Sequence, residues 1–112
     1  MKLLTQKIKK QLPPLYATQD EKNPKIIAHF FSPMGKGDWY VIEGEEEDDG
    51  NYMFFGLVDL LCKEYGYFSL KELESIKLPL GMKIERDMYW TPKRVNELEW
   101  LMECCKWVLE HI

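Results

Sequence analysis

The spacing of apolar residues predicts a helix near the start of the chain. Leu4, Ile8 and Leu12 recur at every fourth position, which places them on one face of an amphipathic helix over residues 3–12. Two consecutive prolines follow this segment. Because proline cannot donate the next helical hydrogen bond, we expect the helix to end there and an extended stretch to begin.

Three later stretches have the composition and alternation of β-strands. They cover residues 25–32, 39–43 and 52–58, and they are rich in aromatic and β-branched side chains. The connection at residues 33–37 has the proline and glycine content of a turn. Strands joined by short connections usually pair as neighbours, so we expect an antiparallel meander.

The second half of the chain carries helix signals. Ser69 and Glu72 have the spacing of a capping box, which predicts a short helix through Ile76. Thr91, followed by proline, is a second helix start, and we expect that helix to reach the C-terminus. The predicted fold is α+β: a small antiparallel sheet of three to four strands with an N-terminal helix, a short central helix and a long C-terminal helix. No repeat or linker divides the chain, so residues 1–112 are expected to form a single domain.

Charge is unevenly distributed along the chain. The formal net charge is −4, but six of the 19 acidic residues lie between positions 43 and 49. The rest carries 13 acidic and 15 basic side chains, which excludes a strongly basic nucleic-acid binder and a uniformly acidic, disordered chain. We interpret the acidic run first as a solvated hairpin loop. The alternatives are a contact for a basic partner, a mimic of DNA phosphates and a calcium loop, whose ligand spacing fits poorly.

Composition also bears on membranes, metals and cofactors. No run approaches the roughly 20 apolar residues that cross a bilayer, and the N-terminus lacks the pattern of a signal peptide. We therefore expect a cytoplasmic protein without a membrane partner. The three cysteines form no C-x-x-C pair and there are two histidines, so neither a metal site nor a cofactor is expected. His29 lies in the middle of a predicted strand and is interpreted as a packed, hydrogen-bonded core residue.

Five short motifs occur in order along the chain. They are LPPLYAT at residues 12–18, WY..E at 39–43, FFG at 54–56, GYFSL.EL at 66–73 and IERD.Y at 84–89. Together they resemble an uncharacterised bacterial family of small proteins of unknown function, often met on plasmids, phages and integrative elements. The resemblance spans about residues 3–91 and implies one small domain, a mobile-element setting and no activity that can be named. The full acidic run and the segment after Pro92 lie outside that pattern.

Aromatic residues are the main candidates for a binding surface. Aromatic-rich concavities are common ligand sites, although packing in the core explains such residues equally well. The candidates that would line a shared pocket are Tyr16, Trp39, Tyr40, Tyr65 and Tyr67.

Glu85, Arg86 and Asp87 form the most enzyme-like cluster. If this segment is extended, Glu85 and Asp87 share a face, where two carboxylates can hold a metal ion or act as acid and base. Glu43 would join them if the strands bring it close. The alternative is a structural Arg86 that binds backbone carbonyls or neighbouring acids. None of these residues is assigned as catalytic, and all count as candidate binding residues.

Two tryptophans mark a candidate interface on the predicted last helix. Trp100 and Trp107 lie one heptad apart with Cys104 between them, on a flank outside the apolar face of that helix. An exposed aromatic patch of this kind suits a homodimer or another protein partner. The alternative is that both tryptophans pack internally.

The lysines of the N-terminal segment suggest a different partner. Lys7, Lys9 and Lys10 would contact the phosphates of a single strand while aromatic rings stack on its bases, unless they only solubilise a helix face. Our preferred hypothesis is a non-enzymatic accessory or interaction protein of a bacterial mobile element, acting through a protein partner of unknown identity. The alternatives are a nucleic-acid-associated factor using these lysines, and a small metal-dependent or hydrolytic enzyme using Glu85 and Asp87.

Overall fold

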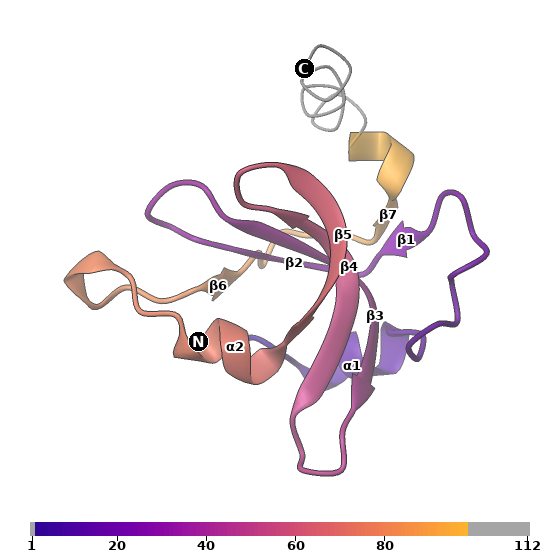
Figure 1. Cartoon of the computed structure of the whole chain (residues 1–112), viewed down its shortest axis with the longest axis horizontal. Helices are drawn as coiled ribbons and strands as arrows, with labels where there is room; N and C mark the ends of the chain where they lie inside the picture. Colours follow the sequence, from indigo (N-terminus) through magenta and orange to yellow (C-terminus); the bar gives the residue numbers. More distant parts are fainter. Residues whose placement is uncertain (1, 99–112) are drawn as a thin grey trace.

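The computed structural model describes residues 2–98, and more of them lie in strands than in helices. The main sheet has five antiparallel strands in the order β5-β4-β3-β2-β6 (Figure 1). A second, two-stranded sheet pairs β1 with β7. The strands are β1 (Lys25–Ile26), β2 (Ala28–Phe31), β3 (Asp38–Glu46), β4 (Tyr52–Asp59), β5 (Lys63–Ser69), β6 (Glu85–Arg86) and β7 (Lys93–Arg94).

The predicted α+β fold with three or four strands and a long C-terminal helix is wrong. Strands β2, β3 and β4 form the expected antiparallel meander, but β5 and β6 extend it to five strands. Within residues 2–98 the α-helices are α1 (Gln6–Gln11) and α2 (Leu70–Ser75), and the 3₁₀ turns are η1 (Pro79–Gly81) and η2 (Val95–Leu98). The described part of the chain is therefore mostly β.

Both short helices begin at a hydroxyl cap. The Thr5 hydroxyl accepts a hydrogen bond from the Ile8 N–H at 3.2 Å, so α1 starts later than the predicted residue 3. The Ser69 hydroxyl accepts from the Glu72 N–H at 3.1 Å, as the capping-box spacing predicted. Because Ser69 is also the last residue of β5, this one side chain marks the change from strand to helix.

The segment after Pro92 pairs with β1 instead of starting an α-helix. The β1–β7 ladder uses its backbone, and the Val95 N–H donates to the Pro24 carbonyl at 3.0 Å. Val95 and Leu98 of η2 are then buried against the sheet. These tertiary contacts override the local helix signal at Thr91. The predicted interface residues Trp100, Cys104 and Trp107 lie outside the described residues.

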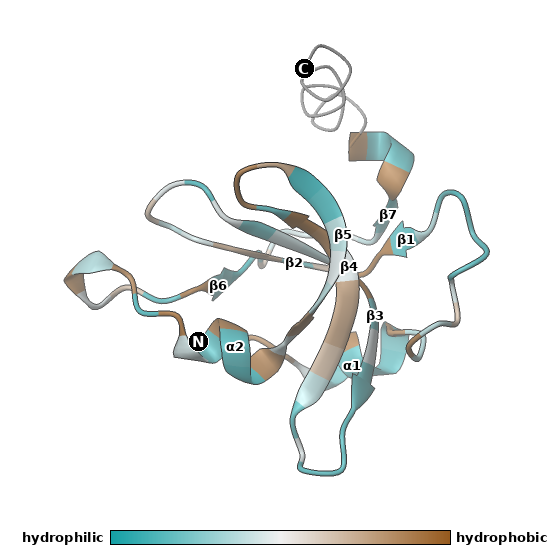
Figure 2. Ribbon diagram, in the orientation of Figure 1, coloured by the Kyte–Doolittle hydropathy of each residue, from teal (hydrophilic) through white to brown (hydrophobic). Residues whose placement is uncertain are grey.

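Each face of the main sheet carries its own apolar core. On the Trp39 face, Trp39, Phe30 and Phe54 pack with leucines of the N-terminal segment and of α2. On the Tyr40 face, Tyr40 and Ile42 pack with residues of β1 and η2. Figure 2 shows the end of the β3–β4 hairpin as hydrophilic, beyond both cores. No helix within residues 2–98 is long and apolar enough to cross a membrane.

Candidate functional site

A β-bulge in β3 determines where Glu43 points. The register with β4 shifts between Val41 and Glu43, so Ile42 between them has no partner on β4. An extra residue in one strand interrupts the alternation of faces, and Ile42 and Glu43 therefore both lie on the Tyr40 face. Strict alternation would place Glu43 beside Trp39 on the opposite face.

Glu43 is buried and holds the segment between α1 and β1. It is 2% exposed, and its Oε1 accepts the Tyr16 N–H at 2.7 Å. Its Oε2 accepts the Thr18 N–H at 2.8 Å and also the Thr18 hydroxyl. All three donors belong to the LPPLYAT motif, and hydrogen bonds to an ionised acceptor are among the stronger ones. Glu43 therefore fixes the Tyr16–Thr18 part of this motif over the Tyr40 face.

Tyr16 has an unusual backbone conformation. Its φ of 72° lies in the left-handed region, which costs a residue other than glycine about 1–2 kcal/mol. The bonds from Tyr16 and Thr18 to Glu43 hold the backbone there. As a result the Tyr16 side chain is 62% exposed, and its ring centroid lies 6.3 Å from that of Tyr67. Backbone strain of this kind is concentrated at functional sites.

Four aromatic rings form a row beside Glu43. The Phe55 centroid lies 5.0 Å from that of Tyr67 and 5.9 Å from that of Tyr65, with 8° between the Phe55 and Tyr65 planes. Phe55 of β4 is paired in register with Tyr67 of β5, so their side chains share a face. Tyr65 and Tyr67 are 46% and 52% exposed. The row ends at Tyr16, which faces Tyr67.

These residues enclose a pocket of about 290 Å³. We call it the aromatic pocket, and its defining residues are Tyr16, Glu43, Phe55, Tyr65 and Tyr67, with Glu21 and Lys22 at its rim. The pKa of Tyr67 is raised. The main cause is partial desolvation, and the nearby Tyr16 hydroxyl and Glu43 carboxylate add to it. A tyrosine hydroxyl is already neutral at neutral pH, and this shift extends its protonated range to higher pH.

Within residues 2–98, the Glu43 carboxylate has no cationic partner. The ion pairs of this part of the chain involve other carboxylates. The partners of Glu43 are two backbone N–H groups and one hydroxyl, all neutral. Glu45 follows two positions later in the same strand and so adds a second carboxylate on the same face.

A second polar cluster lies near the start of β3, also on the Tyr40 face. His29 Nε2 is 2.7 Å from Asp38 Oδ1, and His29 Nδ1 is 3.0 Å from Asp87 Oδ2. The imidazole stacks on Tyr40 at 4.6 Å with 6° between the planes. Burial lowers the pKa of His29, but the hydrogen bonds and charges of Asp38 and Asp87 outweigh burial and raise it overall. His29 is therefore packed and hydrogen-bonded, as its place in the strand predicted.

Asp59 completes this cluster, which we call the histidine cluster, together with His29, Asp38 and Asp87. Asp59 is buried and pairs in register with Asp38 across β3 and β4. Lys63 Nζ lies 3.3 Å from its Oδ2, and Lys36 Nζ lies 3.9 Å from its Oδ1. Every carboxylate of the histidine cluster thus has a cationic group within ion-pair distance.

The remaining predicted aromatic residues do not reach the aromatic pocket. Trp39 and Tyr40 are both buried and point to opposite faces of the sheet. Tyr40 lies beneath His29. The pKa of Tyr40 is raised, mainly by burial and further by the charges of Asp38, Asp59 and Asp87. Trp39 and Tyr40 are therefore core residues, whereas Tyr16, Tyr65 and Tyr67 converge.

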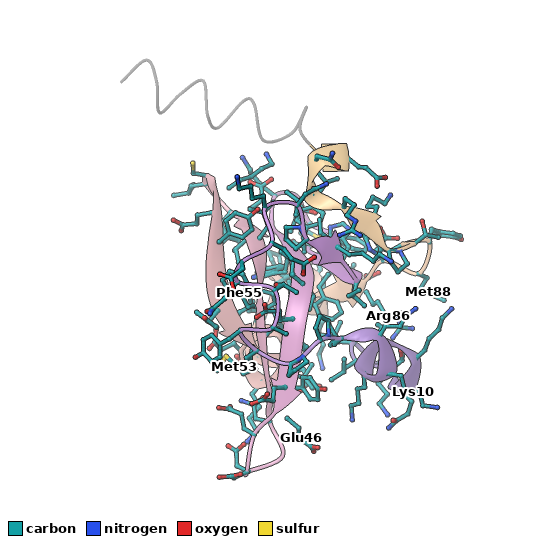
Figure 3. The ribbon with its side chains drawn as sticks, turned by 90° about the vertical axis from the view of Figure 1, so that its right-hand side faces the viewer. Lys10, Glu46, Met53, Phe55, Arg86 and Met88 are labelled. Carbon is teal, nitrogen blue, oxygen red and sulfur yellow. The ribbon has the colours of Figure 1, made fainter. Side chains whose placement is uncertain are left out.

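The acidic residues of the IERD motif lie at the other edge of the sheet. Glu85 and Arg86 form β6, and Arg86 Nη1 donates to the Lys2 carbonyl. Asp87 bonds His29, while Glu43, Glu85 and Asp87 line three different pockets. Figure 3 places Arg86 and Phe55 on different sides of the molecule. The three carboxylates do not meet in one cleft.

The N-terminal lysines point to different surroundings. Lys7 lines a pocket of about 380 Å³ together with Arg86. Lys9 Nζ lies 5.8 Å from the ring centroid of Tyr52, and Lys10 is exposed. Figure 3 places Lys10 away from Phe55.

Thr18 and Phe55 belong to the aromatic pocket but were not among the predicted residues. Thr18 lies in the LPPLYAT motif and Phe55 in the FFG motif. The sequence alone does not show that these two motifs meet in space. No set of three or more His, Cys, Asp or Glu side chains within residues 2–98 is arranged to hold a metal ion.

A family model described as "Protein of unknown function (DUF2958)" matches residues 3–102. This range contains all five motifs and every residue of the aromatic pocket. No curated protein gives a significant match to the chain. No solved structure gives one either.

Proposed function

The chain belongs to the DUF2958 family, whose function is unknown, and we propose that it is a non-enzymatic interaction protein that binds a protein partner through the aromatic pocket. The setting in a bacterial mobile element, implied by the motif resemblance, is part of this proposal. An accessory role of this kind needs a recognition surface and no reactive centre.

The convergence of the motifs on one exposed pocket carries this proposal. LPPLYAT supplies Tyr16, WY..E supplies Glu43, FFG supplies Phe55 and GYFSL supplies Tyr67. Tyrosines left half exposed on a sheet face are typical anchors of protein interfaces, because they offer large contact area at low entropic cost. A strained Tyr16 held outward by Glu43 is costly for folding alone and is explained by recognition.

The arrangement of the acidic and histidine side chains supports binding over catalysis. Glu43, Glu85 and Asp87 line separate pockets, so they cannot share a substrate. Both nitrogens of His29 are engaged by carboxylates, which leaves no free ring nitrogen to take a proton. The enzyme hypothesis therefore has less support than the interaction hypothesis.

Nucleic-acid binding also has less support. Lys7 lines a different pocket and Lys9 lies near the ring of Tyr52, so the exposed rings of the aromatic pocket lie elsewhere. A single-strand site combines cations and stacking rings along one groove.

A comparison of two variants in affinity capture from the native host tests the proposal. The double substitution Tyr65→Ala/Tyr67→Ala removes two rings from the pocket, and we expect it to reduce recovery of the main partner about tenfold or more. Mass spectrometry of the captured protein gives the readout.

Tyr89→Ala is the matched control. This tyrosine is 95% exposed and does not line the aromatic pocket. Equal recovery of the partner by the double variant and the wild type would contradict the proposed function. Circular dichroism of both variants shows whether the fold is kept.

A further inference from the structure

The buried Glu43 carboxylate has no ion pair within residues 2–98. It is nearly inaccessible to water and bonded only to neutral donors. Buried charges in proteins are normally paired, because moving an isolated ion out of water is costly. Three hydrogen bonds stabilise the carboxylate but do not neutralise it. The pocket that Glu43 lines is therefore suited to an incoming cation.

The rings around Glu43 favour the same kind of ligand. The faces of aromatic rings are negative, and a cation within about 6 Å of a ring centroid is attracted to them. Tyr67 lies between Phe55 and Tyr16, with centroid separations of 5.0 and 6.3 Å. Several ring faces and one carboxylate thus surround a single space.

The size of the pocket limits what can enter. Its volume of about 290 Å³ lies just below the roughly 300–1,000 Å³ seen for small-molecule sites. One long side chain fits within this volume.

Further acidic side chains lie next to the pocket on β3. Glu45 shares the face of Glu43, and the acidic hairpin continues from it to Asp49. At the rim, Glu21 is paired with Arg94 at 3.7 Å, while Lys22 is exposed and therefore screened by water. The acidic residues of β3 and its hairpin, on one side of the pocket, favour a basic partner.

We infer that the aromatic pocket takes one cationic side chain of the protein partner, an arginine guanidinium or a lysine ammonium, with the charge next to Glu43. This inference rests on the proposed function and specifies the chemistry of the partner. The acidic hairpin then contacts other basic residues around the inserted side chain.

Paired probes that differ in charge test the inference directly. Nα-acetyl-arginine amide is compared with Nα-acetyl-citrulline amide, and Nα-acetyl-lysine amide with its Nε-acetylated form. Ring-proton shifts of Phe55, Tyr65 and Tyr67 are followed by NMR during titration of the whole chain. At least one charged probe should bind about tenfold more tightly than its neutral counterpart. Equal affinity within both pairs, or no shift of the pocket rings, would overturn the inference.

Two substitutions examine the roles of the rings and of the charge. Tyr67→Leu removes a ring face and should weaken binding of the charged probe about fivefold. Tyr67→Phe keeps the ring and should restore part of the lost affinity. Lys22→Ala removes a like charge from the rim and should strengthen binding about twofold. These sites are exposed, so the fold tolerates the changes. Weaker binding after Lys22→Ala would contradict the role of charge.

The outcomes separate this inference from the proposed function. If neutral and charged probes bind equally while Tyr65→Ala/Tyr67→Ala loses the partner, the pocket recognises another kind of side chain and the cationic occupant is excluded. If the double variant keeps the partner, the proposed function itself fails.

Discussion

Two charged clusters lie on the same face of the sheet and are neutralised differently. In the histidine cluster, His29 lies between Asp38 and Asp87, and Asp59 lies close to two lysines. In the aromatic pocket, Glu43 has three neutral donors and no ion pair within residues 2–98. In the first cluster each carboxylate lies within ion-pair distance of a cationic group, whereas the carboxylate of the second has no ion pair within residues 2–98.

This difference separates a structural cluster from the proposed recognition site. The histidine cluster connects β2, β3 and the chain after β6, so its ion pairs hold the sheet together. Glu43 also holds a segment, but it does so with its charge left uncompensated and with a tyrosine forced into a left-handed conformation. Such costs are tolerated where a partner completes the site.

Removal of the Glu43 side chain should have the largest effect on stability. Glu43→Ala leaves the N–H groups of Tyr16 and Thr18 and the Thr18 hydroxyl without their acceptor. Unsatisfied buried donors cost about 1–3 kcal/mol each, so we expect a loss of about 3–4 kcal/mol in the free energy of unfolding, measured in urea. Glu45→Ala, at an exposed site two residues away, should change it by less than about 0.5 kcal/mol. Similar losses for both variants would contradict the anchoring role.

The histidine cluster should show a smaller effect that depends on pH. The pKa of His29 is raised above 6.5 in the folded protein, so its charge contributes fully below pH 6.5. This contribution is lost as the pH rises through the folded pKa. His29→Gln should therefore lower the free energy of unfolding by about 2 kcal/mol near pH 6 and by less at pH 9. Urea unfolding at both pH values gives the measurement. If the difference in the free energy of unfolding between variant and wild type grew with pH, the ion pairing of His29 would be disproved.

The smallest effect is expected at Tyr16, and it should be stabilising. Glycine adopts the left-handed region without strain, so Tyr16→Gly should raise the free energy of unfolding by about 0.5–1 kcal/mol despite losing the contact with Tyr67. Thermal unfolding gives the measurement, and binding of the charged probe should fall in the same variant. If Tyr16→Gly were less stable than the wild type, the left-handed conformation of Tyr16 would not be strained as its φ value indicates.

The central strands were predictable because their patterns are local. Residues 39–43 and 52–58 have the aromatic and β-branched composition of strands, and both lie inside observed strands. The capping box at Ser69 is likewise a local signal and gave the correct helix start. Strand β5 was missed because only its last residues, Phe68 and Ser69, are buried, as is usual for a strand at the edge of a sheet.

The features that form the site depend on contacts between distant residues. The bulge at Ile42 reverses the face on which Glu43 lies, and no residue type marks it in the sequence. The same holds for β7, where pairing with β1 outweighs the helix signal of Thr91. Aromatic composition grouped Tyr16, Tyr65 and Tyr67, which line one pocket, but it could not separate them from the buried Trp39 and Tyr40.

Intermolecular nuclear Overhauser effects give the most direct test of the uncompensated pocket. With Nα-acetyl-arginine amide bound, the δ-methylene protons beside its guanidinium should contact the rings of Phe55 and Tyr67, and the contacts should disappear when citrulline replaces arginine at the same concentration. Contacts confined to the acidic hairpin at residues 45–49, or equal contacts from citrulline, would contradict the account.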